Sequence, residues 1–200
     1  MSKEIRTQSV PVELRMDGDV IKVSGYAAVF DEETDIGGMF REVIRPGAFK
    51  SAIERNDNVS FLINHDGLPL ARTSSGTLKL TEDRTGLRID TELDATDPDV
   101  ARIVPKMKRG DLDKMSFAFI STREEWTFED GESDLREVMD TELFDVSIVT
   151  DPAYGGTSIA LRSRDDAKPK PKDEEKPEAS KKADSYFLRK ASAENKFRGI

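Results

Sequence analysis

Residues 114–128, KMSFAFISTREEWTF, decide the fold, because their apolar side chains alternate with small and polar ones over the length of a long strand. Residues 134–139, DLREVM, predict the returning strand, and the acidic, glycine-containing loop at 129–133 connects the two. Residues 141–150, TELFDVSIVT, predict a further strand that ends before Asp151 and Pro152. This part of the chain therefore predicts an antiparallel sheet.

The N-terminal half repeats this pattern in two predicted hairpins. Residues 10–14 alternate as a half-buried strand, and a turn at 17–19 leads into a second strand at 20–30. Residues 77–81 and 86–93 alternate in the same way on either side of a four-residue loop. Because paired strands are adjacent in sequence, we expect mostly antiparallel pairing.

Two helices are predicted between the strands. Pro46 would begin the first, over PGAFKSAIERN at residues 46–56. Asp97 would cap the second, which would begin at Pro98 and end at Gly110, with Pro105 kinking or shortening it. With seven or more strands in all, we expect an α+β, mainly β fold, an antiparallel barrel or wrapped sheet surrounded by helices.

Composition excludes several classes of function. The chain has 200 residues, a formal net charge of −9 and no cysteine. The charge argues against a nucleic-acid-binding protein, and the missing cysteines exclude disulfides, thiolate catalysis and zinc–thiolate sites. No apolar run has the roughly 20 residues that a membrane span needs, and the N-terminus shows no secretory signal. We expect no membrane partner, no nucleic acid and no cofactor.

The C-terminal part has a different composition. We predict a folded domain over residues 1–162 and a charged, proline-containing linker over 163–184, which should be disordered. Residues 185–200 regain apolar side chains and could form a docking or self-cleavage segment, or be the frayed end of the chain.

His65 is the only histidine and lies at the end of an apolar run at residues 59–64. Imidazole is the one side chain that titrates unperturbed near neutral pH, so His65 is the candidate base, although a lone histidine is more often structural. Asp66 would point to the opposite face of a strand and is a poor partner for it. One histidine with scattered carboxylates gives no zinc spacing, so no metal site is predicted.

Ser116 and Asp145 are the candidate partners of His65. Alternation puts Ser116 on the face of its strand opposite Met115 and Phe117, where it is either a nucleophile or an ordinary serine on a solvated face. Asp145 lies in an apolar strand and must either face water or hold a partner, because burying a lone carboxylate is costly. Glu142 is the alternative acid.

Five stretches in order resemble the prohead (capsid-maturation) serine proteases of tailed bacteriophages, over roughly residues 10–162. They are GYAAVF at 25–30, RPGAF at 45–49, FLINHD at 61–66, KRGDLDKMSFAF at 108–119 and ELFDVSIVTDPAY at 142–154. The family is similar in fold to the herpesvirus assemblins, so the resemblance implies an assemblin-like β-barrel. It also implies that His65 is the general base, Ser116 the nucleophile and Asp145 the third catalytic residue.

The resemblance further implies a serine endopeptidase inside the immature procapsid in the host cytoplasm. Its substrates would be the scaffold or the N-terminal part of the major capsid protein, and commonly the protease itself. Assemblin-like enzymes are often activated as dimers, so a homodimer is expected. The alternative is a non-enzymatic capsid-assembly or scaffold factor with the same fold and an inactive site.

Overall fold

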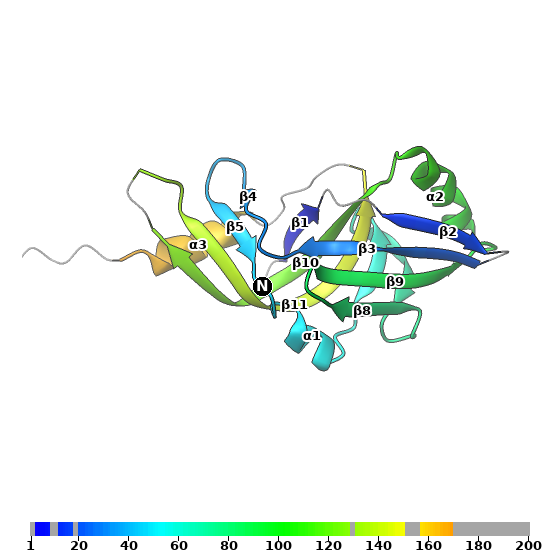
Figure 1. Ribbon diagram of the computed structural model, residues 1–200, viewed down its shortest axis with the longest axis horizontal. Helices are drawn as coiled ribbons and strands as arrows, with labels where there is room; N and C mark the ends of the chain where they lie inside the picture. Colours follow the sequence, from blue (N-terminus) through cyan, green and yellow to red (C-terminus); the bar gives the residue numbers. More distant parts are fainter. Residues whose placement is uncertain (1–2, 9–11, 18–19, 129–130, 151–156, 170–200) are drawn as a thin grey trace, which may run out of the picture. The chain divides into compact units, whose positions relative to one another are not determined.

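A computed structural model describes residues 3–8, 12–17, 20–128, 131–150 and 157–169. The predicted tail at 185–200, and the linker from residue 170 on, lie outside these ranges. The described part is mainly β, with three helices among its residues (Figure 1). The strands are β1 Glu4–Gln8, β2 Glu13–Asp17, β3 Val20–Val29, β4 Thr34–Asp35, β5 Arg41–Ile44, β6 Ser60–Ile63, β7 Asp66–Arg72, β8 Leu78–Glu82, β9 Gly86–Asp94, β10 Lys114–Thr127 and β11 Leu135–Val149; the helices are α1 Lys50–Glu54, α2 Pro98–Arg109 and α3 Thr157–Ala167.

The predicted hairpins are confirmed. β2 pairs with β3, β8 with β9 and β10 with β11, each antiparallel. β3 also pairs with β9, so the first two hairpins form one four-stranded sheet in the order β2-β3-β9-β8. Local alternation and turn residues were sufficient to predict these pairs because each joins neighbouring segments of the chain.

The other sheet has seven strands and two parallel pairings that the sequence did not predict. Its main path is β1-β10-β11-β5-β4, and β6 and β7 extend it beside the C-terminal half of β11. β11 is one continuous strand where we expected a break near residue 140, and it pairs in parallel with β5 at one end and β6 at the other. The described strands form two sheets and no closed barrel, so the predicted barrel is not confirmed.

The prediction for α2 is confirmed at both ends. The Asp97 side chain accepts a hydrogen bond from the Asp99 N–H, and Gly110 ends the helix in the left-handed conformation with φ 80°. Pro105 lies inside the helix without ending it. Its buried face joins the main core, which the two sheets share.

The first predicted helix is much shorter than expected. α1 begins at Lys50, because Gly47 adopts φ 95°, which is incompatible with a helix starting at Pro46. The Glu82 carboxylate accepts hydrogen bonds from the N–H groups of Gly47 and Phe49 instead. The turn before α1 is thus held by β8 rather than by helical bonds.

α3 was not predicted, and it includes residues 163–167, where we expected the linker to begin. Its Ala160 is fully buried in a second small cluster with Ile36 and Phe40, against which Trp126 packs. Figure 1 accordingly shows α3 near β4 and β5, at the end of the long β10–β11 hairpin.

Four charged residues form a buried network between β1, β5 and β11. Glu4, Arg6, Glu42 and Arg136 are each at most 3% exposed. Arg136 donates to Glu4 at 2.6 and 2.9 Å and to Glu42 at 2.8 Å, and it also contacts Glu124. Burial lowers the pKa of Arg136, but the bond to Glu4 and the surrounding carboxylates outweigh burial and leave the pKa raised. Arg136 therefore stays charged while buried.

Glu124→Gln is expected to destabilise the protein at neutral pH by about 1–3 kcal/mol, an effect that disappears in acid. Burial raises the Glu124 pKa, but the charge of Arg136 and the Ser163 hydroxyl outweigh it, so the pKa lies below the ordinary 4.5. A lowered folded-state pKa contributes stability that is complete above about 4.5 and is lost as pH falls through the folded-state value. Urea unfolding from pH 7 to pH 3 measures the difference. The exposed neighbour Glu125→Gln should show no comparable effect, and a pH-independent loss for Glu124→Gln would contradict the assignment.

Candidate active site

His65 lies in a tight turn between β6 and β7, directly after the predicted strand at residues 59–64. Asn64 and His65 both adopt positive φ, 51° and 60°, which is rare outside glycine and is tolerated best by asparagine. The turn is fastened to β11: the Asn64 N–H donates to the Ile148 carbonyl at 3.0 Å, and the His65 N–H donates to Ser147 Oγ at 3.2 Å. These hydrogen bonds hold the strained backbone in place, and the turn directs the imidazole toward Ser116 and Asp145 on the sheet.

Ser116 lies near the start of β10, between β1 and β11. It is opposite Thr7 on one side and Ser147 on the other. As alternation predicted, Met115 and Phe117 point into the core and Ser116 to the other face. Ser116 is nevertheless completely buried, so it does not lie on a solvated face.

Asp145 lies on the same face as Ser116 by alternation with Ser147, and a bulge in β11 follows on its other side, before Leu143. The register between β10 and β11 shifts between the Ala118–Asp145 and Phe119–Leu143 pairs, which leaves Phe144 as an extra residue. Strict alternation had put Leu143 and Asp145 on one face. The structure instead puts Leu143 in the core with Val146, and the bulge separates it from Asp145.

These three residues, which are far apart in the sequence, lie in hydrogen-bonding contact. His65 Nδ1 is 2.6 Å from Asp145 Oδ1, and His65 Nε2 is 2.6 Å from Ser116 Oγ. A histidine whose Nδ1–H donates to a carboxylate has a free lone pair on Nε2, which is the tautomer that can accept a hydroxyl proton. The arrangement is able to activate Ser116 as a nucleophile.

Ser147 is a further member of the site that sequence reasoning missed. Its Oγ lies 3.2 Å from His65 Nδ1 and donates to Asp145 Oδ1 at 3.3 Å. Its position two residues after Asp145 on the same strand was the available signal. The alternative acid Glu142 is exposed, and so is Asp66, and neither has a hydrogen bond to His65 in the described residues.

Comparison with known proteins identifies the family. The sequence profile described as caudovirus prohead serine protease matches residues 8–171, which is most of the chain. The chain belongs to this family. It is also 27% identical over 161 residues to the prohead protease of Enterobacteria phage HK97, which covers 79% of this chain and 67% of that protein. No solved structure matched it. The chain is therefore a serine peptidase of phage capsid maturation, which acts within the procapsid.

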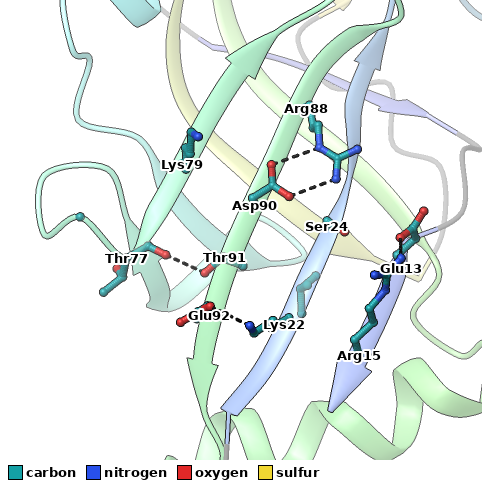
Figure 2. A pocket seen from close by; sticks show the side chains of 12 residues that line it. Glu13, Arg15, Lys22, Ser24, Thr77, Lys79, Arg88, Asp90, Thr91 and Glu92 are labelled. Atoms are coloured by element: carbon teal, nitrogen blue, oxygen red, sulfur yellow. Dashed lines mark hydrogen bonds and ion pairs between the residues drawn. The ribbon is translucent and has the colours of Figure 1, made fainter. Parts of the chain in front are cut away.

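A depression of about 600 Å³ on this prohead protease lies away from the Ser116–His65–Asp145 cluster. Figure 2 shows that side chains of β2, β3, β8 and β9 line it. Its charges are largely paired with one another: Arg88 binds Asp90 at 3.1 Å and Lys22 binds Glu92 at 3.3 Å. Groups that neutralise each other on a sheet surface offer little to a ligand, so the catalytic candidate remains the cluster on β10 and β11.

Within the described ranges the prohead protease shows no group of three or more histidine, cysteine or carboxylate side chains that could hold a metal. Among the same residues no helix is both long and apolar enough to cross a membrane.

Proposed function

We propose that Ser116, His65 and Asp145 form the catalytic triad of an endopeptidase that cleaves scaffold or N-terminal capsid-protein segments, and itself, inside the immature procapsid. The observation that carries this proposal is the pair of 2.6 Å contacts that join the two ring nitrogens of His65 to Ser116 and Asp145. A carboxylate hydrogen-bonded to an imidazole that is in turn hydrogen-bonded to a hydroxyl is the arrangement that serine peptidases use on unrelated folds.

In the proposed mechanism, His65 Nε2 takes the Ser116 proton as Oγ attacks a peptide carbonyl. The C–O bond forms, and the carbonyl oxygen becomes an oxyanion that backbone N–H groups stabilise. The imidazolium then gives its proton to the leaving amine as the C–N bond breaks. Water attacks the acyl-enzyme with His65 again as base, and the acid product leaves.

Asp145 stabilises the imidazolium and fixes the tautomer of His65. It is only 7% exposed, so its charge is poorly screened by water and acts strongly on the ring 2.6 Å away. Ser147 contacts both groups and so limits how far either can rotate. Because the Asn64–His65 turn is bonded to β11 as well, base and acid are held by the same strand.

Co-expression with the major capsid protein of the same phage tests the proposal. Wild-type protease should shorten the capsid subunit at its N-terminal end, and intact-mass measurement should show the protease's own C-terminal segment removed. A fluorophosphonate probe should label Ser116 alone. Assembly of full-length capsid subunits without any shortening would instead favour a non-enzymatic assembly factor. Sedimentation of the active protein tests whether it acts as a homodimer.

A further inference from the structure

β1 lies against the strand that carries the proposed nucleophile. It pairs antiparallel with β10 over five residues, from Glu4 opposite Phe119 to Gln8 opposite Met115. Within this pairing, Ser116 Oγ lies 2.7 Å from the backbone carbonyl oxygen of Arg6. A peptide carbonyl of the chain itself therefore sits against the proposed nucleophile.

This contact competes with activation of Ser116. A serine hydroxyl has one proton, so it cannot donate to the Arg6 carbonyl and to His65 Nε2 together. The hydroxyl is 2.7 Å from the first acceptor and 2.6 Å from the second. With β1 in place Ser116 is also fully buried, so no substrate reaches it. β1 has to move before the enzyme can act.

The charges of β1 explain what holds it there. Glu4 and Arg6 lie two residues apart and thus share one face of the strand. Glu4 accepts from Arg136 on β11, and Arg6 donates to Glu42 on β5 at 2.6 and 2.9 Å. These two binding partners, Arg136 and Glu42, belong to other strands of the sheet and stay in place when β1 leaves. Because Arg136 also bonds Glu42 at 2.8 Å, the vacated site keeps paired charges.

We propose that β1 occupies the position of the substrate strand, and that substrates add to β10 as a strand with an acidic residue and a basic residue in the positions of Glu4 and Arg6. The inference rests on the proposed peptidase function. The bond after the basic residue would be the one cleaved, since the Arg6 carbonyl is the one that Ser116 Oγ contacts; in β1 itself the hydroxyl donates to the carbonyl oxygen and does not attack the carbon. Backbone pairing along β10 supplies binding, and the buried side chains of Arg136 and Glu42 supply specificity.

A charge exchange within the full-length chain tests the first half of the proposal. Glu4→Arg combined with Arg6→Glu keeps the composition but sets like charges against Arg136 and Glu42, so β1 should leave. Fluorophosphonate labelling of Ser116 should become about tenfold faster or more than in wild type. The matched control is Glu13→Arg with Arg15→Glu, an exposed ion pair of the same spacing on β2, which should label at the wild-type rate.

Cleavage of synthetic peptides tests the proposed substrate preference, and it tests the proposal even if the exchanged variant does not fold. A peptide with the sequence of residues 1–12, MSKEIRTQSVPV, should be cut between Arg6 and Thr7. The exchanged peptide MSKRIETQSVPV has the same composition and should be cut about tenfold more slowly or not at all. Mass spectrometry of both reactions, with wild-type protease, gives the site and the rate.

Equal cleavage of the two peptides, or cleavage elsewhere in both, would overturn the inference. Labelling of a folded exchanged variant at the wild-type rate would do the same. If capsid subunits are still shortened in co-expression, the peptidase function stands without the substrate-strand site. If no capsid shortening and no labelling occur in any variant, the proposed function itself is wrong.

Discussion

Ser116→Ala and His65→Ala are each expected to lower the rate of peptide hydrolysis by about 10⁴–10⁶-fold, the largest effects that we predict for single substitutions. Ser116→Ala removes the atom that would form the acyl-enzyme. His65→Ala removes the only histidine, and no cysteine is present to replace it as a base of near-neutral pKa. Single-turnover cleavage of a capsid-derived peptide measures the chemical step without interference from product release.

The double variant Ser116→Ala/His65→Ala shows whether the two residues act together in one catalytic unit or contribute independently to the rate. When nucleophile and base act together, removing the second group after the first has little further effect, so the double variant should be about as slow as either single one. Independent roles would multiply the two losses. Ser121→Ala, on the same strand but outside the cluster, is the matched control and should keep the wild-type rate.

Stability is the other control for these variants. Ser116 is completely buried, and its loss leaves a small void and removes the bond to the Arg6 carbonyl. We expect a loss of about 1–2 kcal/mol in the free energy of unfolding, which leaves a folded protein. A Ser116→Ala variant that stays folded and still hydrolyses the peptide at the wild-type rate would refute the proposed mechanism.

The sequence predicted those elements whose determinants are local. Asp97 and Gly110 mark the ends of α2 through capping and the left-handed conformation, both of which depend on nearby residues alone. The antiparallel hairpins follow from alternation on either side of a turn. Parallel pairing of β11 with β5 and β6 joins distant segments, and nothing in the local pattern specifies such pairs.

β1 shows why a pattern of hydrophobicity can miss a buried strand. Its inward-facing residues, Glu4 and Arg6, are charged, so the segment resembles a solvated terminus. Their burial makes sense only with Glu42 and Arg136, which come from distant strands. Pairing across the sheet satisfies the charges, and sequence order gives no sign of it.

The sequence pointed to the three residues of the candidate site but not to the backbone geometry that brings them together. Composition and alternation supplied His65, Ser116 and Asp145 as candidates, and the resemblance to the family supplied their roles. The turn with positive φ at His65 and the bulge between Leu143 and Asp145 were not predicted, because the turn depends on hydrogen bonds to β11 and the bulge on the pairing of β11 with β10. Strict alternation would have put Leu143 on the face of Asp145, whereas the bulge turns Leu143 into the core.

Asp145→Asn is expected to lower kcat by about 10⁴-fold with little change in structure. The carboxylate accepts the Nδ1 proton at 2.6 Å, which leaves Nε2 free to receive the Ser116 proton. An asparagine can present its NH₂ group to Nδ1 instead, which favours the proton on Nε2 and blocks that transfer. It also removes the negative charge that stabilises the imidazolium. Glu142→Gln, the exposed alternative on the same strand, should keep the wild-type rate.

The single histidine makes the cause of this loss directly measurable. ¹⁵N-labelled histidine gives one pair of ring nitrogen signals, which NMR can assign to His65 without ambiguity. The wild-type neutral ring should carry its proton on Nδ1, and the Asp145→Asn ring should carry it largely on Nε2. Loss of activity with the wild-type tautomer retained would mean that Asp145 acts through its charge alone. Full activity in Asp145→Asn, with its fold intact, would remove Asp145 from the triad.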